Sequence, residues 1–267
     1  MADITVRKIR FDFDDPVELL EPDVDLASTL PLLGLSLTMP YLEPYLMRTM
    51  KTAQKVITDP QVAEDAKNFS QQEGHHFRNH AVFNEKIRES FDEQTGAKLR
   101  AIEDAIEADY QRFTREKSLR FNVAYAEGFE AMTCSGALAM ASHGTLESAS
   151  MLPGGELWAW HMAEEIEHRT VAFDVFDHLD GSYLYRITVG TWSQFHYLRY
   201  IRRFALCMAE ALGTKLTRPR TPMHREAARR YLRTLRPSYH PSDVEVPEIV
   251  GQLLARYDQR VAAAAAS

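Results

Sequence analysis

Two Glu-x-x-His steps, each in a stretch with helical periodicity, constrain the fold of this chain more than any other feature. They are Glu73–His76 and Glu165–His168, and the spacing occurs nowhere else in the sequence. Residues three apart on an α-helix lie about 60° apart, so each step directs a carboxylate and an imidazole to one side. A lone glutamate precedes each step on a separate helical stretch, at Glu43 and at Glu127. The pattern predicts four helices that converge on one polar site.

Four carboxylates buried together would be strongly unfavourable without a cation. Two lone-glutamate helices and two Glu-x-x-His helices supply the ligand set of ferritin-like dimetal proteins. We therefore predict an all-α fold, a ferritin-like four-helix bundle with additional C-terminal helices. The alternative is a set of solvated charges, or a polar network, on amphipathic helices.

Composition narrows the class of protein further. The chain has 267 residues, of which 45% are hydrophobic, enough for one domain with a substantial core. Its two cysteines, Cys134 and Cys207, lie in apolar stretches and fit a reducing compartment. The first residues lack the pattern of a signal peptide, and the longest uncharged runs, 26–42 and 131–146, are short for a membrane span. We expect a cytoplasmic protein that does not enter a membrane.

We expect one domain over residues 1–267. Its parts are an extended acidic arm at 1–27, a metal-binding core at 37–179 and additional helices within 183–263. Periodicity and capping residues predict helices at about 37–57, 59–91, 98–117, 119–142, 156–179, 183–212, 222–235 and 247–263. Pro40 is expected in the opening turn of the first helix, Pro44 should kink that helix, and Thr95-Gly96 should end the second.

The fourth core helix carries a further candidate ligand. His161 lies one turn before Glu165 and on the same face. Three alternatives stay open: Glu130 in place of Glu127, Glu164 in place of Glu165, and His80 as an added ligand or a hydrogen-bond donor to one. Carboxylates and imidazoles without a thiolate form a hard donor set, which favours paired iron or manganese over structural zinc.

A family resemblance appears in the segment 158–176. Its Trp-x-x-Ala-Glu-Glu-x-Glu-His sequence, together with the later Tyr239-His-Pro241, resembles the bacterial family described as predicted metal-dependent hydrolases. The resemblance extends from about Leu37 to that Tyr-His-Pro turn. The spacing of His161, Glu165 and His168 is also similar to that of the arylamine N-oxygenases.

The resemblance implies a non-haem diiron monooxygenase with a ferritin-like core that acts on acyl-CoA thioesters in natural-product biosynthesis. It implies seven ligands for two iron ions: Glu43, Glu73, His76, Glu127, His161, Glu165 and His168. Such an enzyme would hydroxylate a C–H bond with O₂, and no catalytic residue beyond the ligands is expected. The sequence has no flavin or nicotinamide motif, so a ferredoxin or reductase would supply electrons. The alternatives are a metal-dependent hydrolase, an arylamine N-oxygenase or a manganese oxidase.

Basic residues are concentrated near the C-terminal end. Residues 199–236 contain eleven Lys and Arg against two Glu, in a chain of net charge −7. Arg225, Arg229 and Arg233 recur every four residues and predict a stripe that binds the phosphates of a coenzyme A thioester. The alternative is a solvated helix face. Nucleic acid is not expected because the rest of the chain is acidic, and a homodimer is left open.

Overall fold

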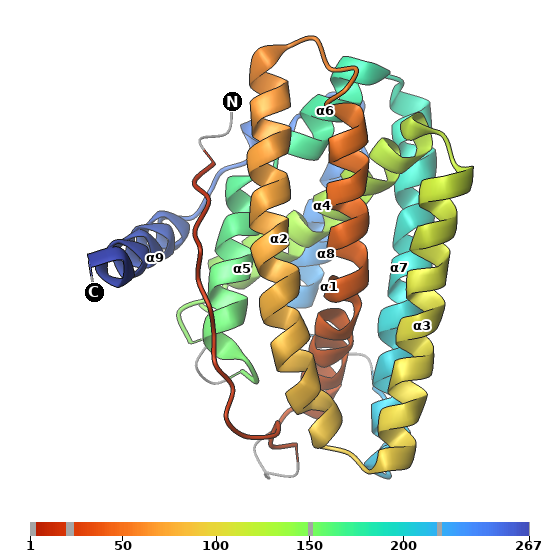
Figure 1. Ribbon diagram of the computed structural model, residues 1–267, viewed down its shortest axis with the longest axis vertical. Coiled ribbons are helices and arrows are strands. Elements are labelled where there is room, and N and C mark those ends of the chain that lie inside the picture. The colour runs from red at the N-terminus through yellow and green to blue at the C-terminus, as the bar shows by residue number, and fades with distance from the viewer. Residues whose placement is uncertain (1–3, 20–23, 149–151, 218–220, 267) are drawn as a thin grey trace.

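The computed structural model describes residues 4–19, 24–148, 152–217 and 221–266, and within these ranges the chain is helical without a β-strand (Figure 1). The all-α prediction is confirmed. The helices are α1 (Leu26–Ala53), α2 (Pro60–Glu89), α3 (Glu93–Glu116), α4 (Leu119–Ser142), α5 (Gly155–Glu167), α6 (Val171–Leu179), α7 (Tyr183–Ala211), α8 (Pro222–Thr234), the 3₁₀ turn η2 (Pro241–Asp243) and α9 (Glu248–Ala266).

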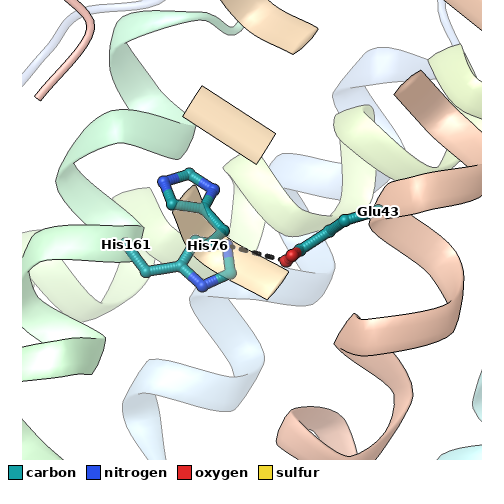
Figure 2. Close-up of side chains that lie close together, drawn as sticks. All are labelled: Glu43, His76 and His161. Atoms are coloured by element: carbon teal, nitrogen blue, oxygen red, sulfur yellow. Dashed lines mark ion pairs between the residues drawn. The ribbon is translucent and has the colours of Figure 1, made fainter. Parts of the chain in front are cut away.

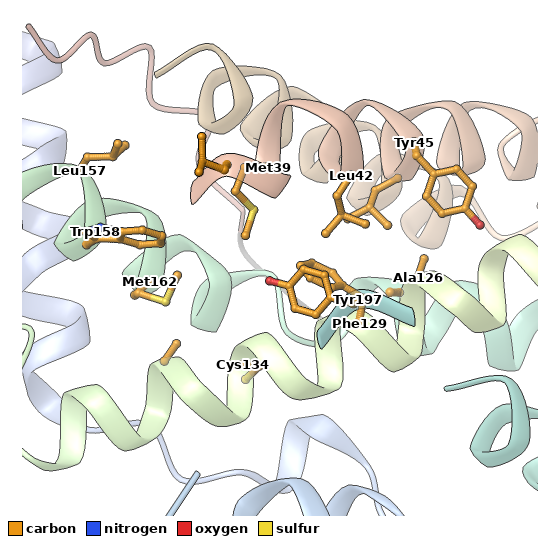
Figure 3. Packing of buried hydrophobic residues seen from close by; sticks show 14 of the residues in the cluster. Met39, Leu42, Tyr45, Ala126, Phe129, Cys134, Leu157, Trp158, Met162 and Tyr197 are labelled. Carbon is orange, nitrogen blue, oxygen red and sulfur yellow. The ribbon is translucent and has the colours of Figure 1, made fainter. Parts of the chain in front are cut away.

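Four helices enclose the centre of the bundle. α1 packs along α2 and also contacts α4, while α5 contacts both α2 and α4. α7 lies against α1, α3 and α4, and α8 covers the other side of α4. Figure 3 shows the apolar packing around this centre, with Met39 and Leu42 from α1, Phe129 from α4 and Met162 from α5. The additional helices predicted after residue 183 therefore pack directly on the core helices.

Helix starts follow the capping residues, with two departures from expectation. Asp59 caps α2 as predicted, since its side chain accepts from the backbone N–H of Gln61 and Val62. The expected start of the first helix near Leu37 is wrong, because Asp25 caps α1 at Leu26. Pro40 consequently lies inside α1. The predicted break at 95–96 is also wrong, because the Asp92 cap places both residues in the first turn of α3.

The helix expected at 156–179 is divided in two. α5 ends at Glu167 and α6 begins at Val171, with a turn between them. The N–H of His168 still bonds to the carbonyl of Glu164, and the N–H of Val171 bonds to the carbonyl of His168. His168 is therefore the C-cap of α5, where its buried side chain stays with those of the preceding turns.

The N-terminal segment is extended and runs along the bundle beside α2 and α5 (Figure 1). Ile4, Ile9 and Phe11 are buried in the core. Asn79 of α2 accepts a hydrogen bond from the N–H of Phe11 and donates one to the carbonyl of Ile9. The predicted extended arm is thus a packed layer. Its residues 1–3 and 20–23 lie outside the described ranges.

None of the helices in the described ranges is both long and apolar enough to cross a bilayer. The assignment of the whole chain to one domain stays a prediction.

Candidate metal centre

Seven Glu and His side chains meet where α1, α2, α4 and α5 approach one another. None of them is more than 3% exposed. They are Glu43 of α1, Glu73 and His76 of α2, Glu130 of α4, His161 and Glu165 of α5, and His168 at the end of α5. The structure brings six of the seven predicted ligands together, and Glu130 joins them in place of Glu127.

The first group of donors is Glu43, His76 and His161, whose ligand atoms lie within 4.8 Å of one another (Figure 2). Nε2 of His161 is 3.7 Å from Oε1 of Glu43. The imidazoles of His76 and His161 are stacked, with ring centroids 4.1 Å apart.

The second group is Glu73, Glu165 and His168, again with ligand atoms within 4.8 Å. Nε2 of His168 lies 3.4 Å from Oε2 of Glu165 and 3.3 Å from Oε2 of Glu130. Oε1 of Glu165 is also 2.8 Å from Nε2 of His161, which belongs to the first group. The two groups therefore share one continuous space, as two neighbouring metal ions would require.

Each site histidine has one ring nitrogen engaged away from the carboxylate cluster. Nε2 of His76 donates to Glu164 over 2.9 Å, which leaves Nδ1 toward Glu73. Nδ1 of His168 donates to Oε1 of Gln72 over 3.1 Å, which leaves Nε2 toward the glutamates. These contacts hold the two rings in place and direct their second nitrogens at the glutamates, as the outer partners of metal-bound histidines do.

A hydrogen-bond relay orients the third histidine in the same way. The hydroxyl of Ser36 donates to Asn84, so its oxygen accepts from Nδ1 of His80 at 2.8 Å. Nε2 of His80 then accepts from Nδ1 of His161 at 2.7 Å. Burial lowers the pKa of His80 well below its usual value, in keeping with a neutral ring. Nε2 of His161 is therefore left to face Glu43 and Glu165.

The carboxylates facing these nitrogens lack donors. Among the described residues, both oxygens of Glu43, Glu73 and Glu130, and Oε2 of Glu165, accept no hydrogen bond. Buried polar atoms are almost always hydrogen-bonded, and unpaired buried charges are costly. The carboxylates of Glu43, Glu73 and Glu165 also repel one another. A cation among them would remove both penalties.

The pKa values show the same need for positive charge. Burial, then the like charges of Glu73 and Glu165, raise the pKa of Glu43 well above its usual range. Burial, then the charge of Glu165, raise the pKa of Glu130 to about 8, although His168 opposes this. Burial lowers the pKa of His76, but the nearby carboxylates of Glu164 and Glu73 outweigh that effect and raise it to about 9, so without a metal ion this ring would take up a proton in its place.

The preference for Glu127 over Glu130 requires correction. The carboxylate of Glu127 lies 2.7 Å from Nη1 of Arg186 on α7, and both side chains are buried. Arg186 also donates to the carbonyl of Thr234, so this pair ties α4 to α7 and α8. The two glutamates lie three residues apart and on the same side of α4, but the carboxylate of Glu127 is paired with Arg186 of α7 and that of Glu130 faces His168. The sequence signal for this pairing was Arg186 itself, an arginine among the apolar residues at the start of α7.

The two other candidate ligands left open by the sequence, Glu164 and His80, lie next to the cluster. Glu164 bonds to His76, and His80 bonds to His161, so both act on the predicted ligands from outside. Sequence reasoning missed Arg7, which contacts Glu164 at 3.2 Å and Glu167 at 2.8 Å. It also missed Gln72. The arm that carries Arg7 is aperiodic, so no spacing could indicate this contact.

The predicted arginine stripe lies on α8, beside a cavity of about 760 Å³. Arg233 lines the cavity, as do Arg230 and Arg236, whereas Arg225 and Arg229 are exposed and do not. Cys134, one turn beyond Glu130 on α4, also lines the cavity, which therefore approaches the metal centre from the α4 side. Arg218 and Arg220 of the basic segment lie outside the described residues.

Four carboxylates and three imidazoles make a hard, anionic donor set that fits two divalent ions such as iron or manganese. No similar curated protein and no similar solved structure was found for this chain. A family model described as "Predicted metal-dependent hydrolase" matches residues 5–245, which include the whole donor cluster and most of the cavity wall. The chain therefore belongs to the family of predicted metal-dependent hydrolases, as its resemblance over the α5 segment implied.

Proposed function

We propose that the protein is a non-haem diiron monooxygenase that uses O₂ to hydroxylate a C–H bond of an apolar substrate. The observation that carries the proposal is a buried cluster in which carboxylate oxygens and the facing ring nitrogens of His76 and His168 have no hydrogen-bond partner. The residues that would hold the iron ions are Glu43, Glu73, His76, Glu130, His161, Glu165 and His168.

Paired iron ions, when bound, supply the redox chemistry that activates O₂. The chain itself neutralises, orients and shields them. Four carboxylates balance the charge of two divalent ions, while Glu164, Gln72 and His80 hold the imidazoles in place. Each site histidine also packs on a buried aromatic ring, in the pairs His76–Trp160, His161–Trp158 and His168–Phe69. These rings exclude water, which protects a strong oxidant from side reactions.

The cavity beside α8 is the proposed substrate site. Leu138, Tyr239 and Val244 provide apolar surface, and Arg233 and Arg236 provide positive charge. Asp243 and Glu245 also line the cavity, so the positive charge is concentrated on the α8 side. An apolar group with an anionic handle, such as a coenzyme A thioester, fits this distribution. The two electrons for each turnover would come from a separate ferredoxin or reductase.

Metal content tests the first part of the proposal. Protein produced with iron should contain about two iron atoms per chain, because the donors form two adjacent groups. Glu165→Ala and His168→Ala should each lose iron while retaining helix content by circular dichroism. His224→Ala on α8 is the matched control and should keep its iron. Full activity with zinc alone would contradict the diiron assignment.

The origin of the product oxygen separates the two candidate reactions. A monooxygenase supplied with electrons should place one atom from ¹⁸O₂ in a product that keeps its thioester. The family description favours a second candidate, a metal-dependent hydrolase. A hydrolase would instead release free coenzyme A, would work without air and would take its label from H₂¹⁸O.

Arginine variants test the substrate site independently of the metal. Arg233→Ala and Arg236→Ala should each raise KM for an acyl-CoA about tenfold, the effect of losing one exposed charge-assisted contact, with iron content unchanged. Arg225→Ala and Arg229→Ala are controls, because these residues are exposed on the same helix but do not line the cavity. Equal effects in both sets would point to general electrostatic attraction rather than to a site.

A further inference from the structure

The outer face of α7 carries an unusual concentration of exposed apolar side chains. Eight large hydrophobic residues are exposed in the described part of the chain, and five of these lie on α7. They are Leu184, Trp192, Phe195, Leu198 and Leu206. Phe195 is 74% exposed and Leu184 is 70% exposed. Large apolar side chains that gather on one water-exposed helix face usually mark an interface.

These side chains form one stripe. At about 100° per residue, all five lie within roughly 60° of the direction of Phe195. The opposite face of α7 packs on α1, α3 and α4, and includes the buried residues Tyr197, Tyr200 and Phe204. Of the five, Trp192 also packs on Phe113 of α3 and Phe121 of α4, so the outward surface of the stripe is centred on Phe195.

The spacing of the stripe is symmetric about its centre. Leu184 and Leu206 lie eleven positions before and after Phe195, and Thr188 and Arg202 lie seven positions before and after it. A helix with such a pattern can pair with an identical antiparallel helix across a two-fold axis, since each residue meets its symmetric counterpart. We propose that two copies of this chain form a homodimer through α7, with the two Phe195 side chains meeting on the axis.

The pairing brings apolar residues of the stripe together at its centre and at both of its ends. Leu184 of one copy would meet Leu206 of the other. On the flank of the stripe, Trp192 would meet Arg199 of the second copy, a favourable cation–π combination. The two Arg202 residues would lie about 21 Å apart along the helix axis, beyond the range of strong repulsion at physiological salt. An acidic partner protein would instead require basic residues at the centre of the stripe, where the uncharged Phe195 lies.

The dimer would also leave the proposed function intact. The cavity is lined by α4, α8 and residues 236–247, and none of its lining residues belongs to α7. The inference therefore stands whether the enzyme is an oxygenase or a hydrolase.

Sedimentation equilibrium of the full chain is the first test. The wild type should be a dimer, and Phe195→Glu should weaken association on the order of 100-fold, because it places two like charges at the axis. Leu232→Glu on α8 is the matched control, since Leu232 is also exposed, at 63%, but lies outside the stripe. Circular dichroism of both variants should match the wild type. A wild-type monomer at all concentrations, or an undiminished dimer in Phe195→Glu, would overturn the proposal.

Engineered cysteines test the register of the two helices. In a Cys207→Ser background, Phe195→Cys should form a disulfide between copies, because facing residues of packed helices lie within reach of one. Leu184→Cys and Leu206→Cys should cross-link when mixed but not separately. Cross-linking of Leu184→Cys with itself would indicate a parallel pairing and would refute the two-fold arrangement.

Discussion

Glu127 and Glu130 lie one turn apart on α4, yet their carboxylates have different partners. Glu127 pairs with Arg186, whereas Glu130 lies 3.3 Å from His168 in the donor cluster. Burial raises the pKa of both side chains. Arg186 opposes this effect at Glu127, while the neighbouring Glu165 adds to it at Glu130. The first glutamate therefore contributes to folding and the second is a candidate ligand.

Paired substitutions should separate these roles. Glu130→Gln should lose metal with little loss of apo-protein stability, because it removes one of several crowded negative charges. Glu127→Gln should keep its metal but unfold more easily, by about 3–5 kcal/mol, since it leaves Arg186 buried without a counter-charge. Metal analysis and urea denaturation of the apo proteins provide the two measurements. Metal loss in Glu127→Gln with Glu130→Gln unaffected would return Glu127 to the ligand set.

His196 should make stability depend on pH. Burial lowers its pKa, despite the opposing hydrogen bond to Asp109, and Tyr125, Tyr200 and Trp192 also surround the ring. The unfolded chain therefore takes up a proton near pH 6.5, before the folded chain does, and stability falls as the pH decreases through that range. His196→Gln should reduce the loss of stability between pH 7 and pH 5 in urea denaturation. His143→Gln, at an exposed position, is the control, and an equal change in both would exclude this role for His196.

At the scale of elements, the crossing of α4 and α7 depends on two glycines. A Cβ at Gly128 would overlap the Cα of Gly190 and would lie 2.8 Å from Oγ of Ser193. Backbone atoms of α7 cannot move aside as a flexible side chain can. This close approach brings Arg186 to Glu127 and so helps to set which glutamate of α4 faces the cluster.

Alanine substitutions on α4 should therefore have opposite effects. Gly128→Ala should destabilise the protein by about 1–3 kcal/mol or more, as overpacking does. Gly136→Ala should stabilise it by up to about 1 kcal/mol, because a Cβ there meets nothing within 4 Å and alanine is the better helix former. Chemical denaturation measures both effects. A neutral Gly128→Ala would mean that α4 and α7 can separate without cost.

At the scale of the whole molecule, the donor cluster links helices that are far apart in the sequence. Its side chains come from α1, α2, α4 and α5, so a metal ion that binds them would connect these helices. Arg7 extends the connection, since it also bonds to Asp258 of α9 at 2.8 Å. Metal binding and global folding should therefore be coupled.

Removal of metal should lower the unfolding temperature. Apo protein prepared with a chelator should gain stability when Fe²⁺ is restored anaerobically, by about 2.7 kcal/mol when the free ion reaches 100 times its Kd. His168→Ala should lose most of this gain. Differential scanning calorimetry measures the shift. The same gain in His168→Ala would place the stabilising ion elsewhere in the protein.

The sequence by itself determined the helical class and the local direction of the donors. Two three-residue steps and the single turn from His161 to Glu165 specify which side chains share a helix face, because helical geometry depends only on local spacing. The capping residue Asp59 located the start of α2 for the same reason. Six predicted ligands were brought together on this basis, although their role as ligands stays a prediction.

Only the tertiary structure decided which faces meet. Glu130 replaced Glu127 because α7 crosses α4 at a glycine pair and supplies Arg186, a contact between residues 59 positions apart. Arg7 reached Glu164 across 157 positions from an aperiodic arm, and Arg236 joined Arg233 around a cavity. Such contacts depend on how whole surfaces pack, and no local spacing encodes them.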